Sequence, residues 1–169
     1  MRTESLTTHK DKMPSSIPRL NTRLESEGAE FLVLGQLLIA KVATYKTYTN
    51  MPGYDLVATN TETNRAAKIQ VKSRWRTGAP GFLIKNVECD FVVFCRLNRG
   101  HKDGLGAVLD PEYFVLPASV VRMALNTDTA WSKVYVRDIK DLETYRNRWD
   151  LVREFLAPVK TRKKRVSRA

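Results

Sequence analysis

The stretch Ala66-Ala67-Lys68-Ile69-Gln70-Val71-Lys72-Ser73, residues 66–73, alternates apolar or small residues with polar ones. Successive side chains of a strand point to opposite faces, so Ala67, Ile69 and Val71 would share one face. The even-numbered residues would then share the other. The pattern predicts a half-buried strand on which Gln70 and Lys72 project side by side.

A second predicted strand, residues 54–58, precedes this one, and the polar residues 59–64 between them suit a hairpin turn. An antiparallel hairpin that closes near residues 61–63 would bring the surroundings of Asp55 and Lys72 together. The carboxylate and the Gln70 amide oxygen are ligands that a hard ion such as Mg²⁺ takes, and an ammonium can neutralise charge on a phosphate. The alternative is an ordinary Asp55–Lys72 ion pair, worth at most about 1 kcal/mol when exposed.

Residues 21–45 are predicted to form a long helix before the hairpin. Between residues 31 and 43 nearly every residue except Gln36 and Lys41 is apolar or small, so we expect this helix to be buried on most sides. Glu30 would share a face with the leucines and point toward the buried side, where a carboxylate needs a partner. Glu27, one turn earlier, is the competing candidate, and either glutamate could simply pair with Lys72 or Arg74.

Further apolar runs at residues 82–84 and 90–97 are expected to continue the sheet. They are followed by a predicted strand at 113–116, a helix at 117–125, a strand at 134–136 and a closing helix at 142–156. Cys89 and Cys95 flank one apolar run without a zinc-binding spacing, which indicates core packing. We expect one domain over residues 21–157, between a polar N-terminal arm (1–20) and a basic C-terminal tail (158–169).

The composition favours a polyanionic partner. Lys and Arg outnumber Asp and Glu by 29 to 18 in 169 residues, which gives a net charge of +11; the sequence pI is near 9.9. Nucleic acid is the leading candidate. No run approaches the roughly 18 apolar residues of a membrane-spanning helix, and the first residues contain no signal-peptide core. We therefore expect a cytoplasmic protein without a membrane partner.

Three segments taken together resemble the PD-(D/E)xK nuclease superfamily, the fold of restriction endonucleases and Holliday-junction resolvases. They are Gly28-Ala29-Glu30 leading into the helix, Pro52-Gly53-Tyr54-Asp55-Leu56, and Ile69-Gln70-Val71-Lys72. The resemblance implies an α/β fold with a restriction endonuclease-like core, in which helices flank a central mixed sheet of four to five strands. It also implies a divalent-metal-dependent endonuclease that hydrolyses DNA phosphodiester bonds.

In that family the equivalent positions form the catalytic site, which here implies the set Glu30, Asp55, Gln70 and Lys72. The resemblance places Mg²⁺ or Mn²⁺ on Asp55, Gln70 and the backbone carbonyl of Val71, with Glu30 acting through a water and Lys72 assisting the attacking water. Two departures stand out: Gln70 replaces the usual acid, and Gly53 and Tyr54 separate Pro52 from Asp55. Glutamine here is similar to a known variant that includes an intron-encoded homing endonuclease. We expect it to bind Mg²⁺ more weakly than an acid would.

Two basic segments are candidate contacts to DNA phosphates. These are Ser73, Arg74, Trp75 and Arg76 after the second strand, and Lys160, Arg162, Lys163, Lys164 and Arg165 in the tail. The alternatives are an exposed turn with a packing tryptophan, and a solvated tail. The expected partner is double-stranded or branched DNA, and cutting both strands of a symmetric site favours a homo-oligomer, a dimer or tetramer. The competing functions are a non-catalytic DNA-binding protein with a nuclease fold and a basic RNA-binding or assembly protein.

Overall fold

The computed structural model describes residues 22–48, 53–101, 103–126 and 132–158. The elements, in chain order, are α1 (Arg23–Ile39), β1 (Thr44–Lys46), β2 (Leu56–Asn60), β3 (Arg65–Arg74), β4 (Gly81–Leu83), β5 (Phe91–Arg96), β6 (Glu112–Pro117), α2 (Ala118–Met123), β7 (Leu125–Asn126), β8 (Lys133–Tyr135), the 3₁₀ helices η1 (Val136–Asp138) and η2 (Leu142–Tyr145), and α3 (Asp150–Leu156). The expected arm lies outside the described residues, as does the expected tail beyond Pro158.

Five strands form a central mixed sheet in the order β1-β2-β3-β5-β6. β3 and β5 run parallel, and the other neighbours are antiparallel. The β2–β3 hairpin closes at the pair Asn60↔Arg65, which leaves residues 61–64 as its turn. The α/β class and the predicted mixed sheet of four to five strands are therefore confirmed.

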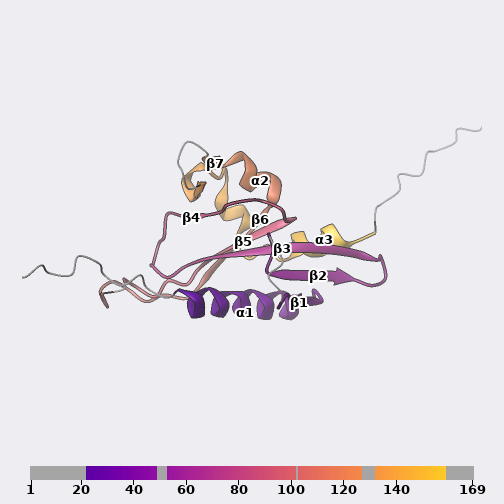
Figure 1. Ribbon diagram of the computed structural model, residues 1–169, viewed down its shortest axis with the longest axis horizontal. Helices are drawn as coiled ribbons and strands as arrows, with labels where there is room; N and C mark the ends of the chain where they lie inside the picture. Colours follow the sequence, from indigo (N-terminus) through magenta and orange to yellow (C-terminus); the bar gives the residue numbers. More distant parts are fainter. Residues whose placement is uncertain (1–21, 49–52, 102, 127–131, 159–169) are drawn as a thin grey trace, which may run out of the picture.

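The two faces of the central sheet have different covers (Figure 1). On one face, Ala67, Ile69 and Val71 of β3 pack with α1 and α3. On the other face, β5 and β6 pack with β4, β8 and α2. The period-two pattern thus separates two apolar layers, and it turns Gln70 and Lys72 away from the layer that contains α1. Both cysteines are buried free thiols, as their apolar surroundings predicted.

Strand β4 does not continue the central sheet, contrary to the expectation for residues 82–84. It pairs with β8 in a second, three-stranded sheet of order β4-β8-β7. Gly81 makes this pairing possible, because a Cβ at that position would lie 2.0 Å from the carbonyl oxygen of Val134. The contact joins residues more than fifty positions apart, so local apolarity could not reveal it.

Helix α1 ends at Ile39 rather than near residue 45. Lys41 adopts a left-handed backbone with φ of 60°. The N–H groups of Lys41 and Val42 bond back to the carbonyls of Leu38 and Leu37, the pattern of a Schellman cap. Glycine usually occupies this position, and because the residue here is lysine, the sequence contains no signal for the end of the helix. The next residues, Thr44–Lys46, form β1 instead.

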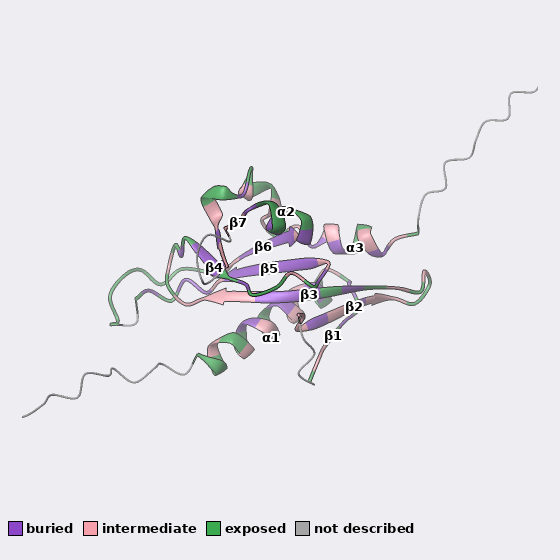
Figure 2. Cartoon of the chain, turned by 45° about the horizontal axis from the view of Figure 1, so that its top comes forward, coloured by how far each residue is buried: buried purple, intermediate pink, exposed green. Residues whose placement is uncertain are grey.

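The expectation that α1 is buried on most sides is also wrong. Its buried residues are Ala29, Val33 and Leu37, which face the sheet. Leu24, Phe31, Leu32, Leu38 and Ile39 are exposed. Figure 2 shows exposed and intermediate segments along α1 beside its buried ones. The helix lies on the outside of the molecule, where a single face meets the core. Within the described residues, the helices are too short or too polar to cross a membrane.

The predicted closing helix, residues 142–156, is two separate elements. η2 covers Leu142–Tyr145 and α3 covers Asp150–Leu156. Between them Arg146 is extended and pairs with Phe114. Its guanidinium binds the carboxylates of Glu112 and Glu143, both at 2.6 Å. This tertiary anchor, followed by a left-handed backbone at Asn147, interrupts the helical pattern.

Truncating Leu37 should destabilise the fold strongly, because its side chain is fully buried between α1 and the sheet. We expect Leu37→Ala to lower the free energy of unfolding by about 2–5 kcal/mol in urea denaturation. Leu105→Ala, at a loop leucine that is 68% exposed, is the matched control and should change it by less than about 0.5 kcal/mol. Equal losses in the two variants would contradict the assignment of α1 to the core.

Candidate functional site

Asp55 lies immediately before β2 and is held from two sides. Its N–H donates to the carbonyl of Ile69 at 2.9 Å, and its carbonyl accepts the N–H of Thr47 at 3.0 Å. Its Oδ2 accepts the backbone N–H of Val71 at 2.7 Å. The strand register Leu56↔Ile69, extended by one residue, places Asp55 opposite Gln70. The carboxylate is therefore fixed at the middle of β3, beside Gln70 and Val71.

Gln70 is a buried polar residue, 8% exposed, in the middle of β3. Among the described residues, its Oε1 is a buried side-chain oxygen without a hydrogen-bond partner. Such an unsatisfied group costs about 1–3 kcal/mol of stability. An amide oxygen held in this way suits a cation or a water molecule that supplies the missing interaction.

Lys72 follows Gln70 on the same face of β3, as the alternation predicts. Burial lowers the pKa of Lys72 below its ordinary value of 10.5, and the Asp55 carboxylate acts in the opposite direction. No ion pair joins the two side chains among the residues that the structure describes. The ordinary cross-strand ion pair, the alternative for these residues, is therefore absent from the described structure.

Glu30 has a different partner from those considered in the sequence. Its carboxylate binds the ammonium of Lys46, on β1, and Glu27 lies 3.8 Å from the same ammonium. The side chain of Lys46 is 7% exposed, and its ammonium lies 5.1 Å from the centroid of the Phe31 ring. Burial alone would lower the pKa of Lys46, but the hydrogen bond to Glu30 and the charges of Glu30, Glu27 and Asp55 raise it.

Lys46 is a site neighbour that the sequence analysis missed. It falls just after the predicted helix, in Thr44-Tyr45-Lys46-Thr47-Tyr48-Thr49. Alternating β-branched and aromatic residues of this kind favour a strand, and that signal could have separated β1 from α1. A strand here would have brought Lys46 into consideration as the partner of Glu30.

The charges of the two neighbouring groups are coupled. Glu30 as well as Asp55 favours the charged form of Lys72, and Asp55 favours that of Lys46. Asp55, Gln70 and Lys72 thus form one patch on β2 and β3, and Glu30 with Lys46 adjoins it from α1 and β1. Within the described residues, no group of three or more His, Cys, Asp or Glu side chains converges as a metal site. A metal here would depend on a mixed donor set of one carboxylate and the Gln70 amide oxygen.

Cys89 is a further neighbour of this patch. Burial raises the pKa of the Cys89 thiol to about 11, while a hydrogen bond with the backbone of Gln70 and the charge of Lys72 lower it. The thiol is therefore protonated at neutral pH and contributes packing beside Gln70, in agreement with its predicted role.

The residues after β3 that were expected to contact phosphate differ in their exposure and in the direction of their side chains. Arg74 donates from Nε to the carbonyl of Gly81 at 3.3 Å, which directs it toward β4. Trp75 packs against the core layer of α1 and α3, so the packing interpretation holds for this side chain. Arg76 is exposed, and Ser73 is half-buried. The tail residues Lys160, Arg162, Lys163, Lys164 and Arg165 lie outside the described residues.

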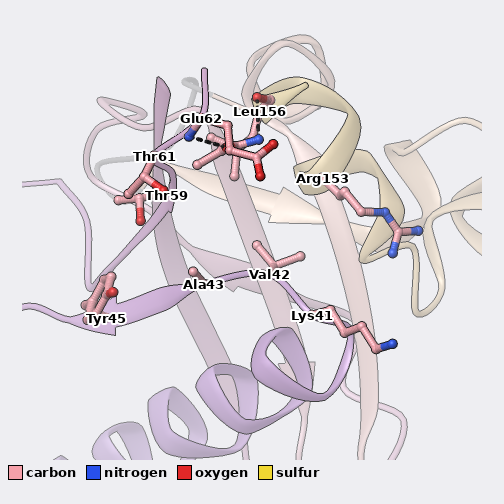
Figure 3. Close-up of a pocket in the computed structure, with 10 residues that line it drawn as sticks. Lys41, Val42, Ala43, Tyr45, Thr59, Thr61, Glu62, Arg153 and Leu156 are labelled. Atoms are coloured by element: carbon pink, nitrogen blue, oxygen red, sulfur yellow. Dashed lines mark hydrogen bonds between the residues drawn. The ribbon is translucent and has the colours of Figure 1, made fainter. Parts of the chain in front are cut away.

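A pocket of about 400 Å³ opens away from this patch, between the β2–β3 turn, β1 and α3 (Figure 3). Its lining residues are Lys41, Val42, Ala43, Tyr45, Thr59, Asn60, Thr61, Glu62, Arg153 and Leu156. Asp55, Gln70 and Lys72 are not among them. The candidate site is thus separate from this pocket.

The sequence matches no known family model and no curated protein. The fold, however, has a precedent. The chain shares it with a bacterial homing endonuclease. The match to that structure, I-Ssp6803I, has a TM-score of 0.54 and 19% sequence identity, and it covers 80% of this chain and 94% of that chain. At this identity the likeness concerns the fold, which is the nuclease-like core that the sequence resemblance implied.

Lys72 should destabilise the protein at neutral pH, because burial disfavours its charged form. Its folded pKa lies below the unfolded value of 10.5, so this cost is fully present below the folded pKa and is lost as pH rises toward 10.5. Urea denaturation should therefore show Lys72→Met as more stable than wild type at pH 7. The difference should shrink at pH 10, and a difference that grows with pH would contradict this assignment.

Proposed function

We propose that this protein is a divalent-metal-dependent endonuclease that hydrolyses DNA phosphodiester bonds. The observation that carries the proposal is the unpartnered Oε1 of Gln70, buried beside the fixed carboxylate of Asp55 and next to Lys72. The fold shared with a homing endonuclease and the net charge of +11 support a DNA substrate.

The residues fit a Mg²⁺ or Mn²⁺ ion, because Asp55 and Gln70 offer the oxygen ligands that hard cations take. The Val71 carbonyl is the proposed third protein ligand. A bound ion would polarise the scissile phosphate and lower the pKa of a coordinated water. The hydrogen bond from the Val71 N–H to Asp55 Oδ2 orients the carboxylate before any ion arrives.

Lys72 is the proposed partner of the attacking water and of the charge that develops on the phosphate. Its lowered pKa makes the ammonium a better proton donor than an exposed lysine, and the Asp55 carboxylate favours its charged form. Glu30, proposed to act through a water, is held in place by Lys46. The negative charge of Glu30 also favours the charged form of Lys72.

A non-catalytic DNA-binding protein with the same fold is the second candidate. Gln70 favours it, because an amide brings no negative charge to a cation where the resembling family has an acid. Both candidates share a double-stranded or branched DNA partner, and for both we propose a homo-oligomer. They differ in cleavage alone.

Cleavage of plasmid DNA should require both the metal and the two charged residues. With Mg²⁺ or Mn²⁺, wild type should convert supercoiled plasmid to nicked or linear forms, and EDTA should stop the reaction. Asp55→Ala and Lys72→Ala should each cut at least about 100-fold more slowly, the size of effect that one positioned catalytic group provides. Quantified agarose gels give the rates.

Lys68→Ala is the matched control, since this exposed lysine lies on the same strand and face as Lys72. It should cut at nearly the wild-type rate. If wild type and all three variants bind DNA without cutting, the enzyme proposal fails and the non-catalytic candidate stands.

Gln70→Glu should strengthen metal binding, because a carboxylate replaces the neutral oxygen at the proposed ligand position. The readout is the metal-dependent rise in melting temperature of the protein without DNA. Gln70→Glu should reach its half-maximal rise at least about 10-fold lower Mn²⁺ concentration than wild type, in line with the added charge interaction. Gln70→Leu should melt higher than wild type without metal and respond least to it. Identical metal responses in all three proteins would exclude Gln70 as a ligand.

A further inference from the structure

The side of α1 that points away from the sheet is made of apolar residues and glycines. We call this the outer face of α1: Leu24, Gly28, Phe31, Leu32, Gly35, Leu38 and Ile39. At 100° per residue these seven positions fall within about 120° of the helix circumference, opposite the buried Ala29, Val33 and Leu37. Leu24 is 80% exposed and Ile39 is 77% exposed.

This composition is the reverse of what an exposed helix face normally carries. A surface helix places charged and polar residues on its solvent side, and a contiguous apolar patch marks an interaction site. The charged residue of α1 between Gly28 and Ile39 is Glu30, which turns aside to Lys46. Within the described residues, most of the outer face therefore stays exposed to solvent, and Phe31 alone of its apolar residues has a charged neighbour, Lys46.

Gly28 and Gly35 lie near the centre of the outer face. A Cβ built on either would meet nothing within 4 Å, so packing within the chain does not require a glycine there. Each glycine costs α1 about 1 kcal/mol relative to alanine. Two flat positions seven residues apart would let the backbone of another helix approach closely, because helix separation depends on the side chains at the contact.

The size of the surface matches what a stable interface needs. Tyr48, 82% exposed, extends it, because the Lys46 ammonium lies 6.0 Å from its ring centroid and 5.1 Å from that of Phe31. With about 200 Å² for a fully exposed large apolar side chain, the five apolar residues and Tyr48 expose on the order of 750 Å². A standard protein interface buries about 800 Å² on each partner.

We propose that the outer face of α1 is the contact of a homodimer, in which two copies of α1 pack antiparallel across a two-fold axis. The apolar residues recur at intervals of seven, at 24, 31 and 38 and again at 32 and 39. The outer face of α1 therefore has apolar residues at both of its ends. A reversed copy then meets apolar residues with apolar residues, as an isologous contact requires. The same arrangement sets the acidic first turn of one helix near Lys41 at the end of the other.

The dimer contact is independent of cleavage chemistry, although it bears on the proposed function. Glu30 borders the outer face, one residue before Phe31. If the nuclease proposal holds, the two-fold axis relates two candidate sites in one particle, an arrangement suited to cutting both strands of a symmetric site. A failed dimer test would leave the single-chain site intact, and a failed cleavage test would leave the dimer intact.

The molar mass in solution tests the proposal without DNA or metal. By size-exclusion chromatography with light scattering at micromolar concentration, the full chain should have at least twice the 19.3 kDa mass of one chain. Leu38→Glu should lower that mass at least twofold, because each copy would bury a carboxylate against apolar residues. Leu105→Glu, at an equally large leucine that is 68% exposed on a loop, should keep the wild-type mass.

A cross-link provides the second measurement. A variant that carries both Gly28→Cys and Gly35→Cys should form a disulfide-linked dimer on mild oxidation, since antiparallel packing about the midpoint of the outer face sets residue 28 of one helix opposite residue 35 of the other, and the native cysteines are buried. A wild-type mass of one chain would overturn the proposal. So would an unchanged mass in both Leu38→Glu and Ile39→Glu while their melting temperatures stay near wild type. If wild type is monomeric and deletion of residues 1–21 makes it dimeric, the arm covers the face instead.

Discussion

Strand β3 is paired on both edges and buries its odd-numbered face against α1 and α3, and the rest of the molecule is arranged around it. β2 joins it antiparallel on one edge and β5 joins it parallel on the other. Apolar layers lie above and below the sheet. In the middle of this strand Gln70 is buried as well, on the opposite face, and Lys72 beyond it is half-buried. The groups proposed to act on DNA, Gln70 and Lys72, therefore occupy one of the most constrained places in the fold.

The same constraint carries an energetic cost. An unpartnered amide oxygen and a lysine whose pKa is lowered by burial both work against stability. A chain selected for stability alone would replace them with apolar residues of similar size. Their presence together, beside a carboxylate that is already oriented, is easier to explain by a ligand than by packing. The half-buried pair of Glu30 and Lys46 adds a second charged group where α1 meets the sheet.

Much of the central sheet was predictable, because its signals are local. The alternation in residues 66–73, the polar turn before it and the apolar run of β5 each specify their own strand, and they placed Asp55, Gln70 and Lys72 on neighbouring strands. Contacts between distant residues were not predictable. Lys41 ends α1 in a conformation that glycine usually adopts, and Arg146 leaves the helical pattern to reach Glu112. Lys46 pairs with Glu30, the glutamate that was expected in the site and whose alternative partners were Lys72 and Arg74. Sequence periodicity describes one helix or strand at a time, so identifying partners that are distant in the sequence requires the three-dimensional structure.

The bond from the Val71 N–H to Asp55 Oδ2 ties the candidate site to the alignment of the hairpin. A slip of one residue between β2 and β3 would move every β3 side chain to the opposite face, removing Gln70 and Lys72 from the patch and exposing Ile69 and Val71. An incorrectly aligned chain would thus lose its chemistry together with its core. If the protein acts on DNA as proposed, this coupling means that newly made copies cannot cut it until they have folded correctly.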